Sequence, residues 1–305
     1  MAEVGLVRFA NVALGIASAV LPLYRAKRSK HIFTQPQLLA ALLVMRFEDW
    51  TFRETEVRLL EHSELRAALG LTRVPDHTAF YRFMRRLRKG LIDEALTEAA
   101  RRMPPAPSGG AVVAVDGTGL ESCSISTYFV QRTGGTFRRH YLKLVVSVDT
   151  RRLVITSQVA RQGPRSDARS LPSLVAGARK LGPVRLVLAD AEFDSHANHA
   201  YIRNQAKAMS VIPARRSRRG HATHGVRAEM RDAFPQELYG ERAQVETVFS
   251  MIKRKLSAKA PGRSATTQKL QAYLLGLAFN IYRLKLWLFT LPHRRHFPFA
   301  YAQTG

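Results

Sequence analysis

The chain has very little cysteine and little acidic charge, and each shortage excludes a class of protein. Cys123 is the only cysteine in 305 residues, so an internal disulfide framework is excluded, and no Cys/His cluster has zinc-site spacing. We therefore expect a reducing, cytoplasmic environment. Asp and Glu number 23 against 48 Lys and Arg, which gives a net charge of +25. A surface of that charge is normally balanced by a polyanion, and nucleic acid is favoured over a membrane surface.

Long uninterrupted apolar runs are also missing. Residues 9–24 are apolar but short for a bilayer span, and the basic residues follow them, which argues against a signal peptide. Residues 267–288 form a longer apolar segment, but Asn280, Arg283 and Lys285 interrupt it. We expect a buried helix or strand-like arm at the first segment, a packed helix at the second, and no membrane partner.

The residues that follow the N-terminal arm have helical periodicity. Apolar spacing predicts helices over 35–47, 53–69 and 77–89, the last with Asp76 as its N-cap and Gly90 as its terminator. A helix, a short turn and a basic helix are typical of a helix-turn-helix that binds DNA, although a plain helical hairpin with a solvated basic face is the alternative. The DNA-contacting candidates on the third helix are Arg82, Arg85 and Arg86.

A Pro/Gly/Ser-rich segment, MPPAPSGG at 103–110, separates this helical region from a region with strand patterns. Strands are predicted at 111–116, 143–148, 153–159, 184–189 and 209–212, and helices at 167–181 and 195–205. This order predicts an α/β fold with one mixed sheet flanked by helices. The predicted organisation is an arm at 1–32, a helix-turn-helix domain at 33–103, a linker at 104–110, a catalytic domain at 111–290 and a tail at 291–305.

Residues 213–235 are basic and poor in apolar side chains. We expect a loop that becomes ordered on DNA, and a simple surface insertion is the alternative. Its DNA-binding candidates are Arg215, Arg216, Arg218 and Arg219.

Two aspartates end apolar strand runs. Asp116 follows AVVAV and Asp190 follows LVLA, where a charge is costly unless it is paired or coordinated. Either aspartate alone could be a strand-end turn former. We favour Asp190 over Asp194, which resembles the N-cap of the next helix. Gly117 and Gly119 leave room for a backbone or a phosphate to approach Asp116.

A third acid lies in the pattern Y-x2-R-x3-E-x6-K, formed by Tyr239, Arg242, Glu246 and Lys253. On a helix these four share one side, beside an apolar stripe of Val245, Phe249, Ile252 and Leu256. We expect Glu246 to join the two aspartates around two divalent cations, which alone relieve the repulsion between the acids. Arg242 and Lys253 are expected to grip phosphates, and Tyr239 to hydrogen-bond a phosphate or stack on a base. Surface pairing of glutamate with arginine is the alternative.

Asp116 in VDGTG, Asp190 in ADAEFD and the Y-R-E-K row together resemble the DDE transposases of bacterial and archaeal insertion sequences. The resemblance runs from about residue 33 to about residue 288. It implies a ribonuclease H-like core, a metal-binding triad of Asp116, Asp190 and Glu246, and DNA contacts from Tyr239, Arg242 and Lys253. It also implies two Mg²⁺ ions, which Mn²⁺ could replace, and double-stranded DNA as partner, both at terminal inverted repeats and at the target. A homodimer or larger synapse, associated with the nucleoid, is implied, and no other protein partner.

Asp190 and Glu246 are separated by 56 positions (246 − 190). Some relatives carry a large β-rich insertion there, for which this chain has no room, so the route of second-strand processing stays open. The alternatives to a transposase are a nuclease or resolvase of the same fold that only hydrolyses, a non-enzymatic helix-turn-helix regulator, and a membrane-surface protein.

Overall fold

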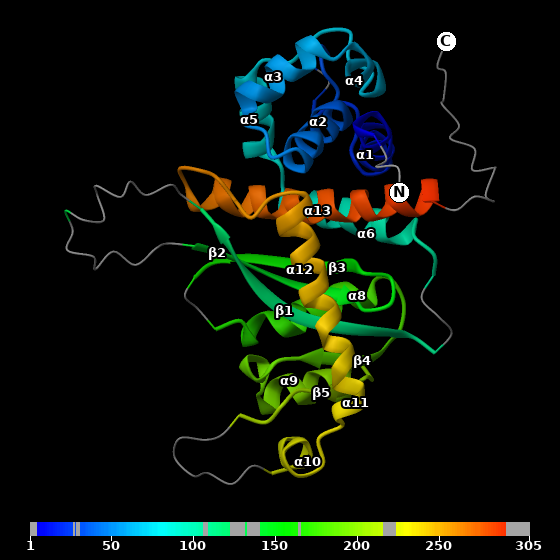
Figure 1. Ribbon diagram of the computed structural model, residues 1–305, viewed down its shortest axis with the longest axis vertical. Coiled ribbons are helices and arrows are strands. Elements are labelled where there is room, and N and C mark those ends of the chain that lie inside the picture. The colour runs from blue at the N-terminus through cyan, green and yellow to red at the C-terminus, as the bar shows by residue number, and fades with distance from the viewer. Residues whose placement is uncertain are drawn as a thin grey trace.

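A mixed five-stranded sheet forms the centre of the protein, with helices on both of its faces (Figure 1). The structure is a computed structural model that describes residues 5–26, 28, 31–105, 109–122, 132, 141–163, 166–215 and 224–290. The strand order is β3-β2-β1-β4-β5, with β1 antiparallel to β2 and parallel to β4. The strands are β1 (Ala111–Glu121), β2 (Tyr141–Asp149), β3 (Val154–Gln162), β4 (Val184–Ala189) and β5 (Met209–Val211).

All five predicted strands are therefore present, and β4 has the predicted bounds. The first strand is longer than predicted because β1 continues past Asp116 to Glu121, paired with β2 throughout. The sheet and its covering helices confirm the predicted ribonuclease H-like α/β class.

The two faces of the sheet have separate hydrophobic cores. Val112 and Ala114 of β1 point to one face, and Val113 and Val115 point to the other, because side chains alternate along a strand. The first face, here called the α12 face, is covered by α6 (Lys89–Arg101), α12 (Ala243–Lys255) and α13 (Ala265–Thr290). The second, called the α8 face, is covered by η1 (Ala168–Ser170), α8 (Leu171–Arg179) and the helices that follow β4.

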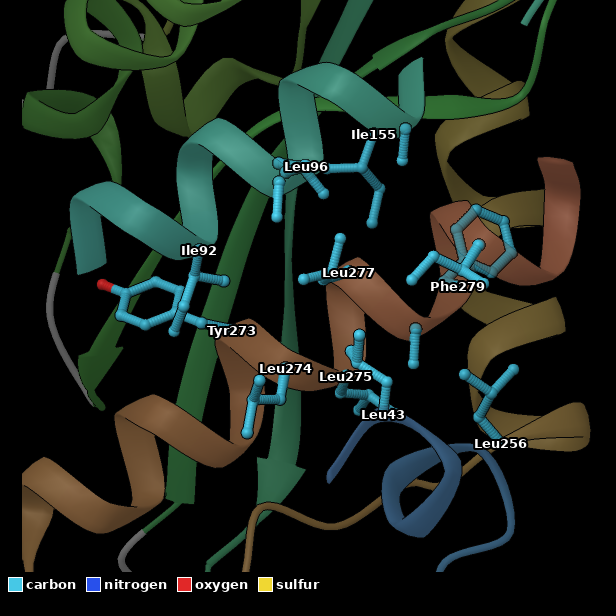
Figure 2. Close-up of a cluster of buried hydrophobic side chains, with 14 of the residues drawn as sticks. Leu43, Ile92, Leu96, Ile155, Leu256, Tyr273, Leu274, Leu275, Leu277 and Phe279 are labelled. Carbon is cyan, nitrogen blue, oxygen red and sulfur yellow. The ribbon is translucent and has the colours of Figure 1, made fainter. Parts of the chain in front are cut away.

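One core joins the N-terminal helices to the α12 face. Figure 2 shows Ile92 and Leu96 of α6, Leu277 of α13 and Ile155 of β3 meeting in this core, with Leu43 of α2 at its far side. The long helix α13 packs against α2 on one side and against α6 and β3 on the other (Figure 2). The division into separate domains stays a prediction.

The N-terminal helices are α1 (Leu6–Val20), α2 (Gln35–Phe47), α3 (Phe52–Glu61), α4 (Ser63–Ala68) and α5 (His77–Arg86). The prediction for α2 is confirmed residue for residue. The apolar N-terminal segment is a helix whose buried side packs on α2, α6 and α13. No helix among the described residues combines the length and the apolar character needed to cross a membrane.

Two of the predicted helix boundaries are wrong. The helix predicted over 53–69 is split at His62, whose backbone is extended, and the Arg66 guanidinium binds the carbonyls of Leu59 and Leu60 near the break. The next helix begins at the predicted cap, because Asp76 accepts the N–H of Ala79 at 2.8 Å. It ends at Arg86, however, because the buried Leu87 leaves the helical conformation. Gly90 therefore lies inside α6 and does not terminate α5.

Between β4 and α12, the described residues form several short helices besides β5. It contains η2 (Ala191–Phe193), α9 (His196–Ala200), η3 (Tyr201–Gln205), α10 (Val226–Asp232), α11 (Gln236–Tyr239) and η4 (Gly240–Arg242). The predicted loop at 213–235 thus includes a helix, α10. Arg215 is exposed, and Arg216, Arg218 and Arg219 lie outside the described residues.

Candidate active site

The sheet register brings Asp116 and Asp190 to neighbouring positions. The last parallel pair between β1 and β4 joins Val115 to Ala189, and one aspartate follows each of these residues. Alternation along both strands turns the two aspartates toward the α12 face, because Ala114 and Leu188 belong to the core on that face. The sheet therefore presents two carboxylates side by side.

Each aspartate is oriented by the backbone that follows it. The Asp116 Oδ1 accepts the N–H of Gly117 at 2.7 Å, and the Asp190 Oδ1 accepts the N–H of Glu192 at 2.9 Å. Asp190 is thus the N-cap of η2, the turn with which the chain leaves β4. These hydrogen bonds occupy one oxygen of each carboxylate.

The third acid comes from α12, which packs across β1 and β2 (Figure 1). Val245, Phe249, Ile252 and Leu256 are buried against the sheet, which confirms the predicted apolar stripe. Glu246 is more than half exposed on the polar side of the helix. We name Asp116, Asp190, Glu246 and Arg242 together the acid site.

Arg242 joins two of these acids. Its guanidinium donates to Asp116 Oδ2 at 2.9 Å and to Glu246 Oε1 at 2.6 Å. A single guanidinium group therefore bridges the Asp116 and Glu246 carboxylates. The expectation that metal ions alone relieve the repulsion between the acids is wrong, because an arginine does so here. At a half-buried site, a nearby positive charge lowers the free energy of the ionised acids, which would otherwise be unpaired.

The pKa shifts in this region include electrostatic contributions from the neighbouring acids. Burial raises the pKa of Asp116, and the charge of Asp190 raises it further, against the hydrogen bonds from Gly117 and Arg242. Burial also raises the pKa of the Tyr239 hydroxyl, and the charges of Asp190, Asp116 and Glu246 act in the same direction. Burial alone would lower the pKa of Arg242, but Tyr239, Asp116 and Glu246 raise it.

The Y-R-E-K row begins before α12 and continues along it. Tyr239 lies at the end of α11, its ring 5.6 Å from the Arg242 guanidinium and 5.0 Å from the ring of Phe234. Lys253 is exposed about two turns beyond Glu246. Tyr239, Arg242 and Glu246 are therefore brought together, and Lys253 lies farther along the same helix.

Three carboxylates are a suitable donor set for Mg²⁺, which prefers oxygen ligands and keeps several waters. Among the residues that the structure describes, no three acidic, histidine or cysteine side chains are grouped closely enough to hold a metal ion. The guanidinium of Arg242 lies between Asp116 and Glu246, and the exposed Glu246 has freedom to move. The residues fit the metal chemically once Arg242 turns away from the acids.

Asp194 has a different environment from Asp190. Its fully buried carboxylate accepts three hydrogen bonds from Arg227 and one from the backbone N–H of Arg215. The N-cap of α9 is Ser195, which accepts the N–H of Asn198, so the interpretation of Asp194 as that cap is wrong. Asp194 ties the segment containing α10 to the end of η2.

The two glycines after Asp116 do not leave open space. A Cβ on Gly117 would lie 2.7 Å from the Asp167 carboxylate, and one on Gly119 would lie 3.3 Å from the Tyr141 ring. The expected approach of a phosphate at these two glycines is therefore wrong on the α8 face. Sequence reasoning missed this neighbourhood, whose charged members are Lys143, Asp167 and Glu192. The one signal was a lysine in a largely apolar strand segment.

The topology and the acid site define an α/β protein of the ribonuclease H-like class with acids on two neighbouring central strands of its sheet. Residues 107–281 match the family model described as "Transposase DDE domain". This match covers more than half of the chain, so the protein belongs to the DDE transposase family. A comparison with curated proteins finds no match.

Proposed function

We propose that the protein cuts DNA at the ends of a mobile element and joins the released 3′ end to target DNA. The single observation that carries this proposal is the bridge that Arg242 makes between Asp116 and Glu246, beside the strand pair that carries Asp116 and Asp190, in a chain of the DDE transposase family. We propose the same three acids as the ligands of two Mg²⁺ ions, for which Mn²⁺ could substitute. When bound, the ions would activate the attacking oxygen and stabilise the leaving oxygen.

The chain's own residues have separate roles in this proposal. The sheet holds Asp116 within β1 beside Asp190 at the end of β4, so neither carboxylate needs to search for its position. Arg242 holds the acids together before DNA arrives and then grips a phosphate, for which its planar fork is suited. Tyr239 beside it contacts the same strand, and Lys253 binds a phosphate farther along α12.

DNA binding is assigned to the N-terminal helices and the basic loop. Arg82, Arg85 and Arg86 are exposed on α5, and Glu56 of α3 accepts hydrogen bonds from the backbone and ring of His77 at the start of α5. α3 and α5 therefore pack as a pair, although residues 69–76 connect α4 to α5 by more than the three or four residues of a standard helix-turn-helix. The partner is double-stranded DNA, bound by a homodimer or larger synapse.

The first test measures cleavage of DNA that carries the element ends, in Mg²⁺. Asp116→Asn and Glu246→Gln should each abolish cleavage while DNA affinity stays close to that of the unchanged protein. Cleavage without joining would favour the nuclease alternative. DNA binding without cleavage by the unchanged protein would favour the regulator. Short inverted repeats in the DNA that flanks the gene would supply the substrate for this test.

The second test concerns the basic face of α5. Replacing Arg82 and Arg85 together by alanine should weaken binding to element ends and reduce the slope of log affinity against log salt by about 2, since each lost phosphate contact retains about one counterion. A charge-matched pair of exposed residues away from the N-terminal helices, Lys180→Ala with Arg185→Ala, should change the slope less. An unchanged slope in the α5 variant would remove α5 from the DNA interface.

A further inference from the structure

A charged cluster lies on the α8 face of the sheet, directly behind the acid site. The Lys143 ammonium is 2.6 Å from Asp167 Oδ2 and 3.6 Å from Glu192 Oε1. The backbone N–H of Asp167 also donates to Glu192 Oε1, at 3.2 Å. We name Lys143, Asp167 and Glu192 the positioning cluster.

This cluster contacts both chain segments that carry the aspartates. Glu192 belongs to η2, and its backbone N–H is the donor that orients the Asp190 carboxylate. The Asp167 carboxylate lies against the α-carbon of Gly117, the residue whose N–H orients Asp116. The cluster therefore joins β2 and η1 to the two backbone positions that aim Asp116 and Asp190.

Burial argues against two simpler roles. The Lys143 side chain is only 15% exposed and the Asp167 side chain 2%, so Lys143 is poorly placed to grip DNA from solution. A buried ion pair is also weak support for stability, because desolvation offsets most of the attraction. Burial disfavours the charge of Lys143, but the hydrogen bond and the charge of Asp167 outweigh it, so the pKa of Lys143 is raised.

We propose that the positioning cluster sets the spacing of Asp190 and Asp116 by holding η2 against β1. Lys143, Asp167 and Glu192 are positioning residues, since they act through the backbone donors of Glu192 and Gly117. This role rests on the proposed function, because it concerns the arrangement of the acids that would bind metal. Residues that orient metal ligands in this way affect metal affinity nearly as strongly as the ligands themselves.

The test compares matched variants by two readouts that do not depend on cleavage. Binding of Mn²⁺ to the DNA-free protein is measured by the loss of its free EPR signal, and hydrogen exchange is measured at the backbone amides of η2. Lys143→Met should weaken Mn²⁺ binding about tenfold or more and speed exchange in η2. Lys143→Arg should restore most of the affinity. Lys180→Met, which removes an exposed lysine beyond α8, serves as the charge-matched control.

A second pair covers the case in which Lys143→Met fails to fold. Glu192 is about one-third exposed, so its replacement should be tolerated by the fold. Glu192→Ala removes the acceptor of the Asp167 N–H and should speed exchange in η2 and weaken Mn²⁺ binding, whereas Glu192→Gln keeps an acceptor and should retain most of both. Wild-type exchange and wild-type Mn²⁺ affinity in Glu192→Ala would overturn the proposal. If the unchanged protein cuts no DNA while these two readouts still respond, the proposed function fails and the positioning role stands.

Discussion

Asp190 and Asp194 lie in the same turn, four positions apart, and have opposite environments. Asp190 uses one oxygen to cap η2 and turns toward Asp116 and the α12 face. Asp194 is fully buried and receives hydrogen bonds from Arg227 and from the backbone of Arg215. The comparison teaches that acidic character alone does not make a metal ligand. Both oxygens of Asp194 accept hydrogen bonds that hold the fold together, whereas Asp190 accepts the N–H of Glu192 through Oδ1 and has Oδ2 available for chemistry.

The largest expected effect is on activity at Asp190. Asp190→Asn should reduce DNA cleavage at least about a hundredfold, the scale of removing one preorganised charged group from a reacting site. Its unfolding midpoint should not fall, because the asparagine oxygen can still accept the N–H of Glu192. A cleavage assay checks the expected loss of activity, and urea unfolding of the same preparation checks the unchanged stability. Robust cleavage by this variant would remove Asp190 from the site.

The second effect is on stability at Asp194. Asp194→Asn leaves the Arg227 guanidinium without its charged partner, and we expect a loss of about 2–3 kcal/mol, below the range for a wholly buried pair because Arg227 is one-fifth exposed. Urea unfolding followed by circular dichroism measures the loss. Cleavage per folded molecule should change much less than in Asp190→Asn, and a comparable loss would break the distinction between the two aspartates.

Arg242 and Arg227, the arginines that pair with the acid site and with Asp194, provide a second test of the difference between the two environments. Arg242→Ala leaves the acids of the acid site without their common cation, so added Mg²⁺ should stabilise this variant more than it stabilises the unchanged protein. A gain of about 1 kcal/mol corresponds to about 2–4 °C in Tm for a chain of this size. Arg227→Ala is the matched control, and its Tm should not respond to Mg²⁺ beyond the response of the unchanged protein. Equal responses in the two variants would contradict the proposed metal site.

The smallest effect concerns the pH response near Asp194. Burial lowers the pKa of His199, with Arg203 and Arg227 acting in the same direction and Asp194 opposing them. The folded state therefore favours the neutral ring, which binds Ser210 through Nδ1. This stability is complete above about pH 6.5, the ordinary pKa of histidine, and is lost as the pH falls below it toward the lowered value. The Tm of His199→Asn should fall less on acidification than that of the unchanged protein.

Local patterns in the sequence predicted much of the fold. Helix α2, strand β4 and the apolar stripe of α12 follow from periodicity, because each is a repeat within one segment. The break at His62 and the end of α5 at Arg86 were missed, because side-chain hydrogen bonds and core packing decide them and apolar periodicity does not report either. Arg66 binds carbonyls at the first point, and Leu87 turns into the core at the second.

The sequence by itself determined most of the elements and the acids that they carry, since strand periodicity and helix spacing act over a few residues. Only the tertiary structure decided the partners of those acids. Arg242 and Asp116 are 126 positions apart. Lys143 of β2 contacts Asp167, which precedes η1, and Glu192 of η2. Such contacts depend on strand register and on which charged side chains are packed together away from water. Desolvation makes an unpaired charge costly there, so pairing with an opposite charge is favoured.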